Sequence, residues 1–225
     1  MRNRRLKWKN MGVVSYDHAL KLQNEISLSL DENEVVVLCM QHPKVVTLGK
    51  NASEDDLLLS MEEYSNQDIQ IAQSDRGGKV TAHGPGQLVI WPLLRLSPFE
   101  GVKEWVSLLE QIVMTTLSKW QIEAHLDPEH PGVWVGKNKI CAVGLRIKNK
   151  VSTHGIALNI TNSLDIFSTI VPCGLKSRGT TTMSHEAQQK VDVDMVAEEI
   201  CNSFQRLFAQ SAGQSKRQSN VCLAQ

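Results

Sequence analysis

The sequence has no excess charge of either sign, no long apolar run and no paired cysteine motif, and each absence excludes a class of function. Lys and Arg together number 24, as do Asp and Glu, so the formal net charge is zero. The bulk charge therefore gives no reason to expect a nucleic-acid or membrane partner. No apolar run approaches the length that a membrane span needs.

The five cysteines are odd in number, and none lie in C-x-x-C spacing. This pattern predicts neither a disulfide framework nor a structural zinc site, and it favours reduced thiols in a cytoplasmic protein. The basic residues of segment 1–9 are not followed by an apolar stretch, which excludes a secretory signal. We predict a solvated strand at a sheet edge there; a mitochondrial presequence is the alternative.

Hydrophobic residues make up 41% of the 225 positions, enough for one sizeable core. We predict a single α/β (α+β) domain over residues 1–210 and a flexible polar tail over residues 211–225. Ser15 and Asp192 are the expected N-caps of the first and last helices. Apolar patterning predicts strands at 35–40, 45–48, 69–72, 88–96, 133–135, 140–147 and 155–160, and helices at 16–30, 102–120 and 193–207. The hairpin turn is expected at 136–139.

Residues 76–87, with the sequence RGGKVTAHGPGQ, combine four glycines and a proline with an arginine and a histidine. Glycine permits positive φ and lets a ligand approach the main chain closely. Apolar sequence resumes at once with Leu88-Val89-Ile90-Trp91, which predicts a buried strand. A polar, glycine-rich loop leading into such a strand is typical of a wall of a small-molecule pocket. An ordinary surface turn is the alternative.

Three later segments also combine glycine with Lys, Arg, His or Cys: KICAVGLRI at 139–147, STHGIALNI at 152–160 and VPCGL at 171–175. Together with the glycine loop, they closely resemble the octanoyltransferases of lipoate biosynthesis, whose motifs are RGGxxTxHGPGQ, KICAxGxR, HGxALN and PCG. All four motifs occur here in the same order. The resemblance implies the fold of the biotin/lipoate protein ligase catalytic domain, a mixed sheet with packed helices.

The resemblance also implies a reaction. Members of that family move an octanoyl group from octanoyl-acyl carrier protein to a lysine of a lipoyl domain. The implied acceptors are E2 subunits of 2-oxoacid dehydrogenases and the glycine cleavage H protein. The acyl group passes through a cysteine thioester, and the motifs assign this cysteine to Cys173 and its paired lysine to Lys139. Neither a cofactor nor a metal is expected.

The chemistry of the two residue types agrees with these roles. At pH 7 only about 3% of an ordinary thiol is the nucleophilic thiolate. A lysine ammonium ~4 Å away would stabilise the thiolate by up to about 4 kcal/mol at an effective dielectric constant of ~20. Thioester exchange onto Cys173 needs no ATP, in agreement with the lack of a GxxxxGK[ST] loop. In the second half-reaction, a neutral Lys139 is the candidate base for the incoming amine.

The substrate is expected to meet the glycine loop and two apolar segments. The predicted substrate-binding residues are Arg76, Gly77, Gly78, Lys79, Val80, Thr81, Ala82, His83, Ala142, Val143, Gly144, Gly155, Ile156 and Ala157. Backbone N–H groups stabilise a developing oxyanion effectively. The main chain around Gly77 and Gly78, or at Gly174, is the expected source.

Several other residues carry two interpretations. His83 either holds the loop or contacts substrate, and His154 either orients its strand or acts directly. Arg146 is interpreted as a strand-end cation, with steering of the acidic carrier protein as the alternative. Cys141 and His42 are interpreted as structural.

The glycine loop departs from the family pattern at two positions, because Ala82 replaces an aromatic residue and Lys79 replaces a glutamine or an acid. A smaller residue at position 82 is expected to widen the pocket.

The nearest alternative enzyme function is that of the lipoate and biotin ligases, which activate an acid with ATP. Those ligases carry a GGGxVxHDxGN-like loop in place of the HGPGQ sequence found here. An idle acyl-binding relative is the non-enzymatic alternative.

Overall fold

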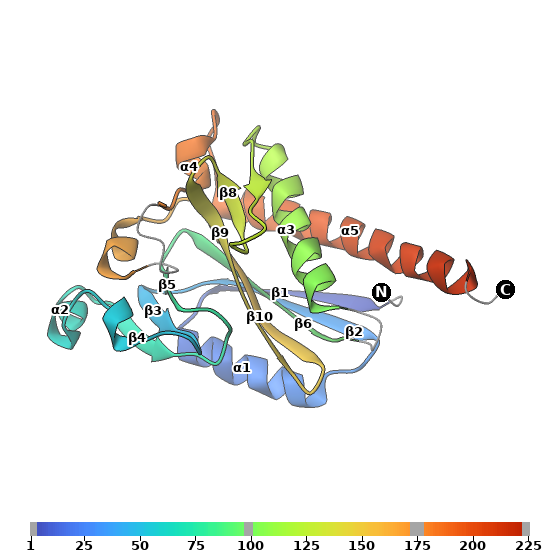
Figure 1. Cartoon of the computed structure of the whole chain (residues 1–225), viewed down its shortest axis with the longest axis horizontal. Helices are drawn as coiled ribbons and strands as arrows, with labels where there is room; N and C mark the ends of the chain where they lie inside the picture. The colour runs from blue at the N-terminus through green and yellow to red at the C-terminus, as the bar shows by residue number, and fades with distance from the viewer. Residues whose placement is uncertain (1–3, 97–100, 172–177, 222–225) are drawn as a thin grey trace.

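The computed structural model of the chain describes residues 4–96, 101–171 and 178–221, with side chains described as far as residue 210. Ten strands and the helices that cover them form its architecture (Figure 1). The strands are β1 (Arg5–Val13), β2 (Glu34–Gln41), β3 (Val45–Leu48), β4 (Gln70–Gln73), β5 (Val80–His83), β6 (Gln87–Arg95), β7 (His125–Leu126), β8 (Val133–Val135), β9 (Asn138–Lys148) and β10 (Val151–Asn159). The helices are α1 (Tyr16–Ser29), η1 (Glu54–Asp56), α2 (Met61–Asn66), α3 (Val102–Ser118), η2 (Asp165–Thr169), α4 (Met183–Glu186) and α5 (Val193–Val221).

The larger sheet has seven strands in the order β1-β2-β6-β10-β9-β8-β7. The β1–β2 pair is parallel and the other pairs are antiparallel, so the sheet is mixed. Residues of β2 and β6 alternate between two cores: Val37 and Ile90 pack with α3 and α5, whereas Leu38 and Trp91 pack with α1. The apolar runs therefore form strands buried on both faces, as their sequence predicts.

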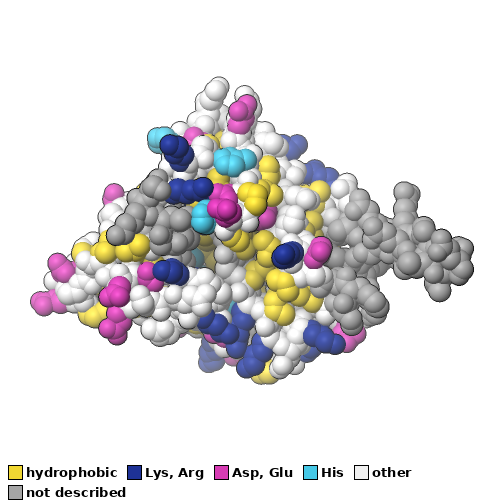
Figure 2. Space-filling model, in the orientation of Figure 1, with side chains coloured by type: hydrophobic (Ala, Val, Ile, Leu, Met, Phe, Trp, Pro, Cys, Tyr) yellow, Lys and Arg dark blue, Asp and Glu magenta, His cyan; other side chains and the backbone are white. Residues whose placement is uncertain are grey.

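The smaller sheet has the order β4-β3-β5, and its own core cluster includes Val46, Tyr64 and Ile170. The adjacent α2 and η1 carry several acids in their first turns, and Figure 2 shows acidic side chains gathered at this end of the molecule. The junction of the two sheets brings β5 and the loop before it beside β6, β9 and β10 (Figure 1).

Most local predictions are confirmed. Ser15 accepts a hydrogen bond from the His18 N–H, and Asp192 accepts one from the Met195 N–H, so both predicted caps exist. The basic N-terminal residues form an exposed edge strand, β1. None of the helices in the described ranges is long and apolar enough to cross a membrane.

Three expectations differ from the structure. The glycine run is not a continuous loop, because β5 forms inside it and pairs with β3. The hairpin turn is shorter than expected, because Val135 pairs with Asn138 and leaves only two residues in the turn. Helix α5 continues to Val221, so the backbone is helical over part of the predicted tail. The domain boundary at residue 210 stays a prediction.

Candidate active site

A cavity that is partly open to solvent lies at the junction of the two sheets. Its lining residues are Tyr16, Arg76, Gly78, Lys79, Val80, Thr81, His83, Val89, Trp91, Lys139, Ala142, Val143, Gly144, His154, Gly155, Ile156 and Ala157. The cavity thus contains Lys139 and all the predicted substrate-binding residues except Gly77 and Ala82. Its walls combine an apolar set, suited to an acyl chain, with a few polar groups, as is usual for small-molecule sites.

The glycine loop is held against the segment that follows β3. The N–H of Lys50 donates to the Arg76 carbonyl at 3.0 Å, and the N–H of Asn51 donates to the Gly78 carbonyl at 3.1 Å. Gly78 has φ +84°, a conformation that glycine adopts without the strain imposed by a Cβ atom. The sequence RGG therefore builds a fixed loop whose main chain borders the cavity.

Arg76 anchors this loop from within. Its guanidinium donates to the Thr47 carbonyl at 2.7 Å and to the Thr47 hydroxyl at 2.9 Å, and its Nη1 donates to the Gly77 carbonyl at 3.1 Å. The side chain is buried, yet it still borders the cavity. Arg76 therefore brings a fixed positive charge to the site as well as holding the loop to β3.

Gly77 is already engaged in this conformation. Its N–H donates to the Leu145 carbonyl at 2.9 Å, which joins the loop to β9. An oxyanion at the site cannot use this N–H unless that bond breaks, so the structure does not support Gly77 as an oxyanion donor. Its role here is to connect the two sheets.

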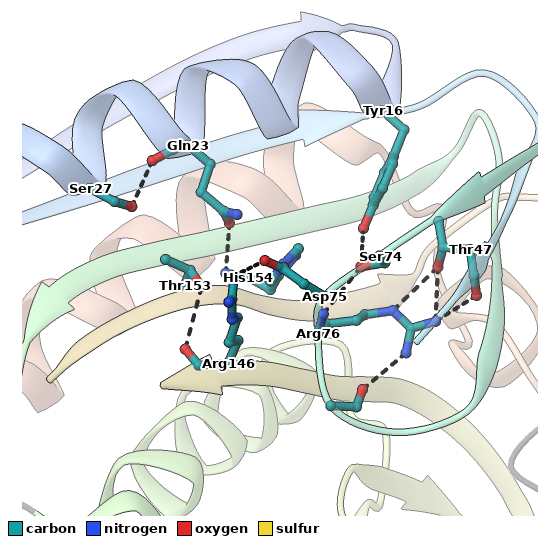
Figure 3. A network of polar contacts seen from close by, with 11 residues as sticks. Tyr16, Gln23, Ser27, Thr47, Ser74, Asp75, Arg76, Arg146, Thr153 and His154 are labelled. Carbon is teal, nitrogen blue, oxygen red and sulfur yellow. Dashed lines mark hydrogen bonds and ion pairs between the residues drawn. The ribbon is translucent and has the colours of Figure 1, made fainter. Parts of the chain in front are cut away.

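The loop before β5 is tied to three further elements by a polar network (Figure 3). The Ser74 hydroxyl lies 2.8 Å from the Tyr16 hydroxyl of α1. Asp75 pairs with Arg146 of β9 and lies 2.6 Å from Nε2 of His154 of β10. Arg146 is thus an ion-pair partner within the domain, in agreement with its structural interpretation.

His83 is a neutral imidazole held in one tautomer. Gln87 donates from its Nε2 to the Ala82 carbonyl and to Asn159 Oδ1, which leaves Gln87 Oε1 as the acceptor. His83 Nδ1, 2.6 Å from that oxygen, must therefore donate, and its Nε2 is an acceptor. Burial, together with the neighbouring His42 and Arg76, lowers the pKa of His83 to about 3.

His154 departs from regular strand geometry, with φ +55°. In the β10–β6 register, Ser152 pairs with Leu94 and Ile156 pairs with Ile90, so His154 lies opposite Pro92, which has no N–H. The His154 N–H donates to Gln23 Oε1 of α1 at 2.7 Å and not to β6. The interrupted pairing thus lets His154 lie against Asp75 while its ring contacts Trp91.

Gly155 follows at a point where the backbones of β10 and β6 approach closely. A Cβ atom on Gly155 would overlap the Ile90 carbonyl oxygen and lie 2.7 Å from Pro92 Cδ. The glycine of the motif HGxALN is therefore required by the packing of two central strands at the cavity wall.

Lys139 is fixed through its backbone and its side chain. Its N–H donates to the Gly179 carbonyl at 2.9 Å, and its carbonyl accepts the Thr181 N–H at 3.0 Å. Its ammonium donates to the Pro131 carbonyl at 3.1 Å and lies 4.7 Å from the centre of the Trp134 ring. The side chain thus lies in the cavity wall with a defined orientation.

Cys173, the predicted nucleophile, and Gly174 lie outside the described residues, so the predicted pairing of Cys173 with Lys139 stays a prediction. The described residues on either side of this segment are hydrogen-bonded to other parts of the chain. The Val171 N–H donates to the Asp56 carbonyl at 2.9 Å, and Gly179 pairs with Lys139.

The other thiol in a motif, Cys141, is a packing residue as predicted. It is fully buried in the main core, and burial raises the pKa of its thiol to about 12. Burial raises the pKa of Cys39 to the same value. Neither thiol is a competing nucleophile, because only a thiolate attacks.

Two departures from the family motif have different consequences. Ala82 is fully buried in the core of the smaller sheet, together with Val46 and Tyr64, and is not part of the cavity lining. The expected widening of the cavity is therefore wrong, because this side chain faces away from it. Lys79 does border the cavity, and its ammonium pairs with Asp56 at 3.6 Å.

Four lining residues are absent from the predicted catalytic and substrate-binding sets: Tyr16, Val89, Trp91 and His154. Tyr16 stacks on His83 with 6.0 Å between ring centres, at the start of α1, far away in sequence. The apolar run of β6 was visible in the sequence, but it does not say which face of the strand meets a cavity. Among the described residues, no cluster of three or more His, Cys, Asp or Glu is arranged to hold a metal ion.

Comparison with known proteins identifies the family. The profile of the Lipoyl protein ligase A/B catalytic domain matches residues 15–205. The chain is 37% identical over 203 residues to the octanoyltransferase of Alkaliphilus metalliredigens, covering 88% of this chain and 93% of that protein. The chain belongs to the octanoyltransferase family. Its activity is accordingly octanoyl transfer in lipoate biosynthesis, and it is an acyltransferase.

Solved structures confirm the predicted fold. Lipoate-protein ligase A bound with ATP gives a TM-score of 0.78 at 15% identity, over 93% of this chain and 86% of that one. The bi-partite lipoate protein ligase studied with its E2 lipoyl domain from Thermoplasma acidophilum gives 0.75 at 14% identity, over 93% and 85%. At such low identity these likenesses establish the ligase-like fold and nothing about activity.

Proposed function

We propose that this octanoyltransferase takes its acyl group from octanoyl-acyl carrier protein and delivers it to the lysine of a lipoyl domain through a thioester on Cys173. The observation that carries the proposal is the position of Lys139. Its ammonium lies in the wall of a largely apolar cavity, and its backbone pairs with the strand-like segment that follows the PCG motif. We propose that the cysteine of that motif uses Lys139 as its base and the cavity as its acyl slot.

In the first half-reaction the Cys173 thiolate attacks the carrier's thioester carbonyl. A new C–S bond forms, the old C–S bond breaks, and the carrier thiol leaves with a proton supplied by Lys139. The nearby positive charge of Arg76, fixed by Thr47, adds to the field that favours an anion at the site. The apolar wall gives the octanoyl chain a surface on which to bury itself.

In the second half-reaction the acceptor lysine attacks the same carbonyl. The new C–N bond forms as the C–S bond breaks, Cys173 leaves as a thiolate, and neutral Lys139 takes the amine proton. The lipoyl domain is proposed as the acceptor because the Thermoplasma ligase of the same fold is described with its E2 lipoyl domain. E2 subunits and the glycine cleavage H protein are the proposed acceptor proteins, and the reduced thiols favour a cytoplasmic location.

The likeness to a ligase bound with ATP makes ATP-dependent ligation the second candidate. The two are separated by incubating the protein with octanoyl-acyl carrier protein and an apo lipoyl domain in the absence of ATP, and following octanoylation of the domain by mass spectrometry. We expect full turnover without ATP. Transfer that requires free octanoate and ATP would contradict the proposal.

Two variants test the assigned residues, with a matched control. Cys173→Ala is expected to abolish transfer, and Lys139→Ala to slow both half-reactions by at least about 10²-fold. Lys137→Ala removes an exposed lysine from the adjacent turn and is expected to retain wild-type activity. Full activity of Cys173→Ala would exclude the thioester route.

A further inference from the structure

Glu110 of α3 is a buried carboxylate that the reaction sketched above leaves without a role. Its residue is only 8% exposed, and it does not line the cavity. Burying a carboxylate is unfavourable unless a partner compensates it. Its Oε1 accepts the Gly132 N–H at 2.8 Å, in the turn that precedes β8. Burial raises the pKa of Glu110, while the Gly132 N–H and the positive charge of Lys139 lower it.

The turn that Glu110 holds is the same turn that holds Lys139. The Pro131 carbonyl, one residue before Gly132, accepts the Lys139 ammonium at 3.1 Å. The His130 carbonyl, one residue earlier, accepts the Trp134 Nε1–H at 3.0 Å, and the Trp134 ring lies 4.7 Å from the same ammonium. Three consecutive residues of this turn are therefore engaged: His130 with Trp134, Pro131 with the Lys139 ammonium and Gly132 with Glu110.

The turn also packs directly on the lysine. A Cβ atom at Gly132 would lie 3.4 Å from Lys139 Cε, so the two residues are already in close contact. In Figure 1, α3 runs beside β8 and β9, and contacts between α3 and β8 confirm that these elements are packed together. A shift of the Gly132 N–H relative to α3 would consequently move both the Pro131 carbonyl and the aliphatic stem of Lys139.

We propose that Glu110 is a positioning residue for Lys139: by binding the Gly132 N–H, it fixes the turn whose Pro131 carbonyl and Trp134 ring orient the ammonium. This inference rests on the proposed role of Lys139. Glu110 touches neither the cavity nor the reacting atoms, so its whole effect passes through the lysine. Misplacing a reacting group by about 1 Å can slow a reaction by about 10²-fold.

The decisive pair of variants is Glu110→Met and Glu110→Gln. Methionine keeps the side-chain volume and removes the acceptor, which leaves the buried Gly132 N–H without its partner and lowers stability somewhat. Glutamine keeps an acceptor oxygen for the Gly132 N–H. We expect Glu110→Met to lower kcat by about 10- to 100-fold with little change in KM for octanoyl-acyl carrier protein. Glu110→Gln is expected to restore kcat to within about threefold of wild type.

The neighbouring Gln111→Ala, an exposed change on the same helix, is the control and is expected to retain wild-type kinetics. All variants are compared well below their melting temperatures, and Glu110→Leu replaces Glu110→Met if the latter does not fold. A kcat for the apolar variant equal to wild type would overturn the inference. So would a glutamine variant as slow as the methionine variant, because that result would assign the effect to lost charge or packing rather than to the Gly132 bond.

A double-mutant cycle separates this inference from the proposed function. If Glu110 acts through Lys139, Glu110→Met is expected to have no further effect on the residual rate of Lys139→Ala. Independent, multiplying effects would overturn the inference. Wild-type activity of Lys139→Ala itself would instead contradict the proposed function. An inactive Lys139→Ala beside a fully active Glu110→Met would refute only the role of Glu110.

Discussion

The stability of the protein at mildly acidic pH is expected to depend on His83. This side chain is 5% exposed, stacks on Tyr16, and donates from Nδ1 to Gln87. Burial lowers its pKa from 6.5 to about 3 in the folded protein. Below pH 6.5 the unfolded chain therefore binds a proton at His83 that the folded chain does not, and unfolding becomes more favourable.

The linkage fixes the sign and the size of the effect. Above about pH 6.5 the titration of His83 does not lower the free energy of unfolding. As the pH falls from 6.5 toward about 3, protonation of His83 in the unfolded chain lowers that free energy progressively. One pKa unit corresponds to about 1.4 kcal/mol, so moving from pH 7 to pH 5 costs about 2 kcal/mol through this group alone. This loss is a large fraction of the free energy of unfolding of a typical domain.

The assay is urea unfolding of the wild type and of His83→Gln at pH 7 and at pH 5. Glutamine does not titrate, so the variant retains every other source of pH dependence. The wild type is expected to lose about 2 kcal/mol more than the variant between the two pH values. Equal losses would refute the reasoning, because they would show that His83 is protonated equally in the folded and unfolded states.

Two structural substitutions have matched controls. Gly155→Ala places a methyl group onto a carbonyl oxygen of β6, so it is expected to lower the free energy of unfolding by at least about 3 kcal/mol, measured by thermal unfolding with circular dichroism. The control is Gly84→Ala, which has no atom within 4 Å of the new Cβ and should change the free energy of unfolding by less than about 1 kcal/mol. A stable, active Gly155→Ala would contradict the packing described between β6 and β10. Gln23→Ala removes the acceptor of the His154 N–H and is expected to cost about 1–3 kcal/mol in urea unfolding, whereas the exposed Asn24→Ala on the same helix should cost less than about 1 kcal/mol. Equal costs for these two helix variants would show that the His154 N–H does not need this partner.

The sequence predicted the elements whose signals are local. The caps at Ser15 and Asp192, the periodicity of α3 and the apolar runs of β2 and β6 all specify structure within a few residues. Three of the four motifs likewise predicted most of the cavity wall, because each of them supplies its own stretch of lining residues, whereas the PCG motif lies outside the described residues. The identification of the family from these motifs is confirmed.

The features that the sequence did not predict depend on contacts between segments that are distant in the chain. Nothing local shows that Tyr16 stacks on His83, or that His154, opposite Pro92, departs from regular strand geometry. The orientation of Ala82 was missed for a similar reason. The motif places it beside pocket residues, but the pleat of β5 turns its side chain into the other core. Glu110 belongs to no recognisable motif, because its hydrogen-bond partner Gly132 lies in a segment that is distant in sequence.

The most direct test of the central claim is intact-protein mass spectrometry of the full chain after incubation with octanoyl-acyl carrier protein, without ATP and without an acceptor domain. The account predicts a mass increase of one octanoyl group, located on Cys173 by peptide mapping and released when a lipoyl domain is added. An unmodified wild-type protein that still octanoylates the lipoyl domain, or an adduct that persists in Cys173→Ala, would contradict it.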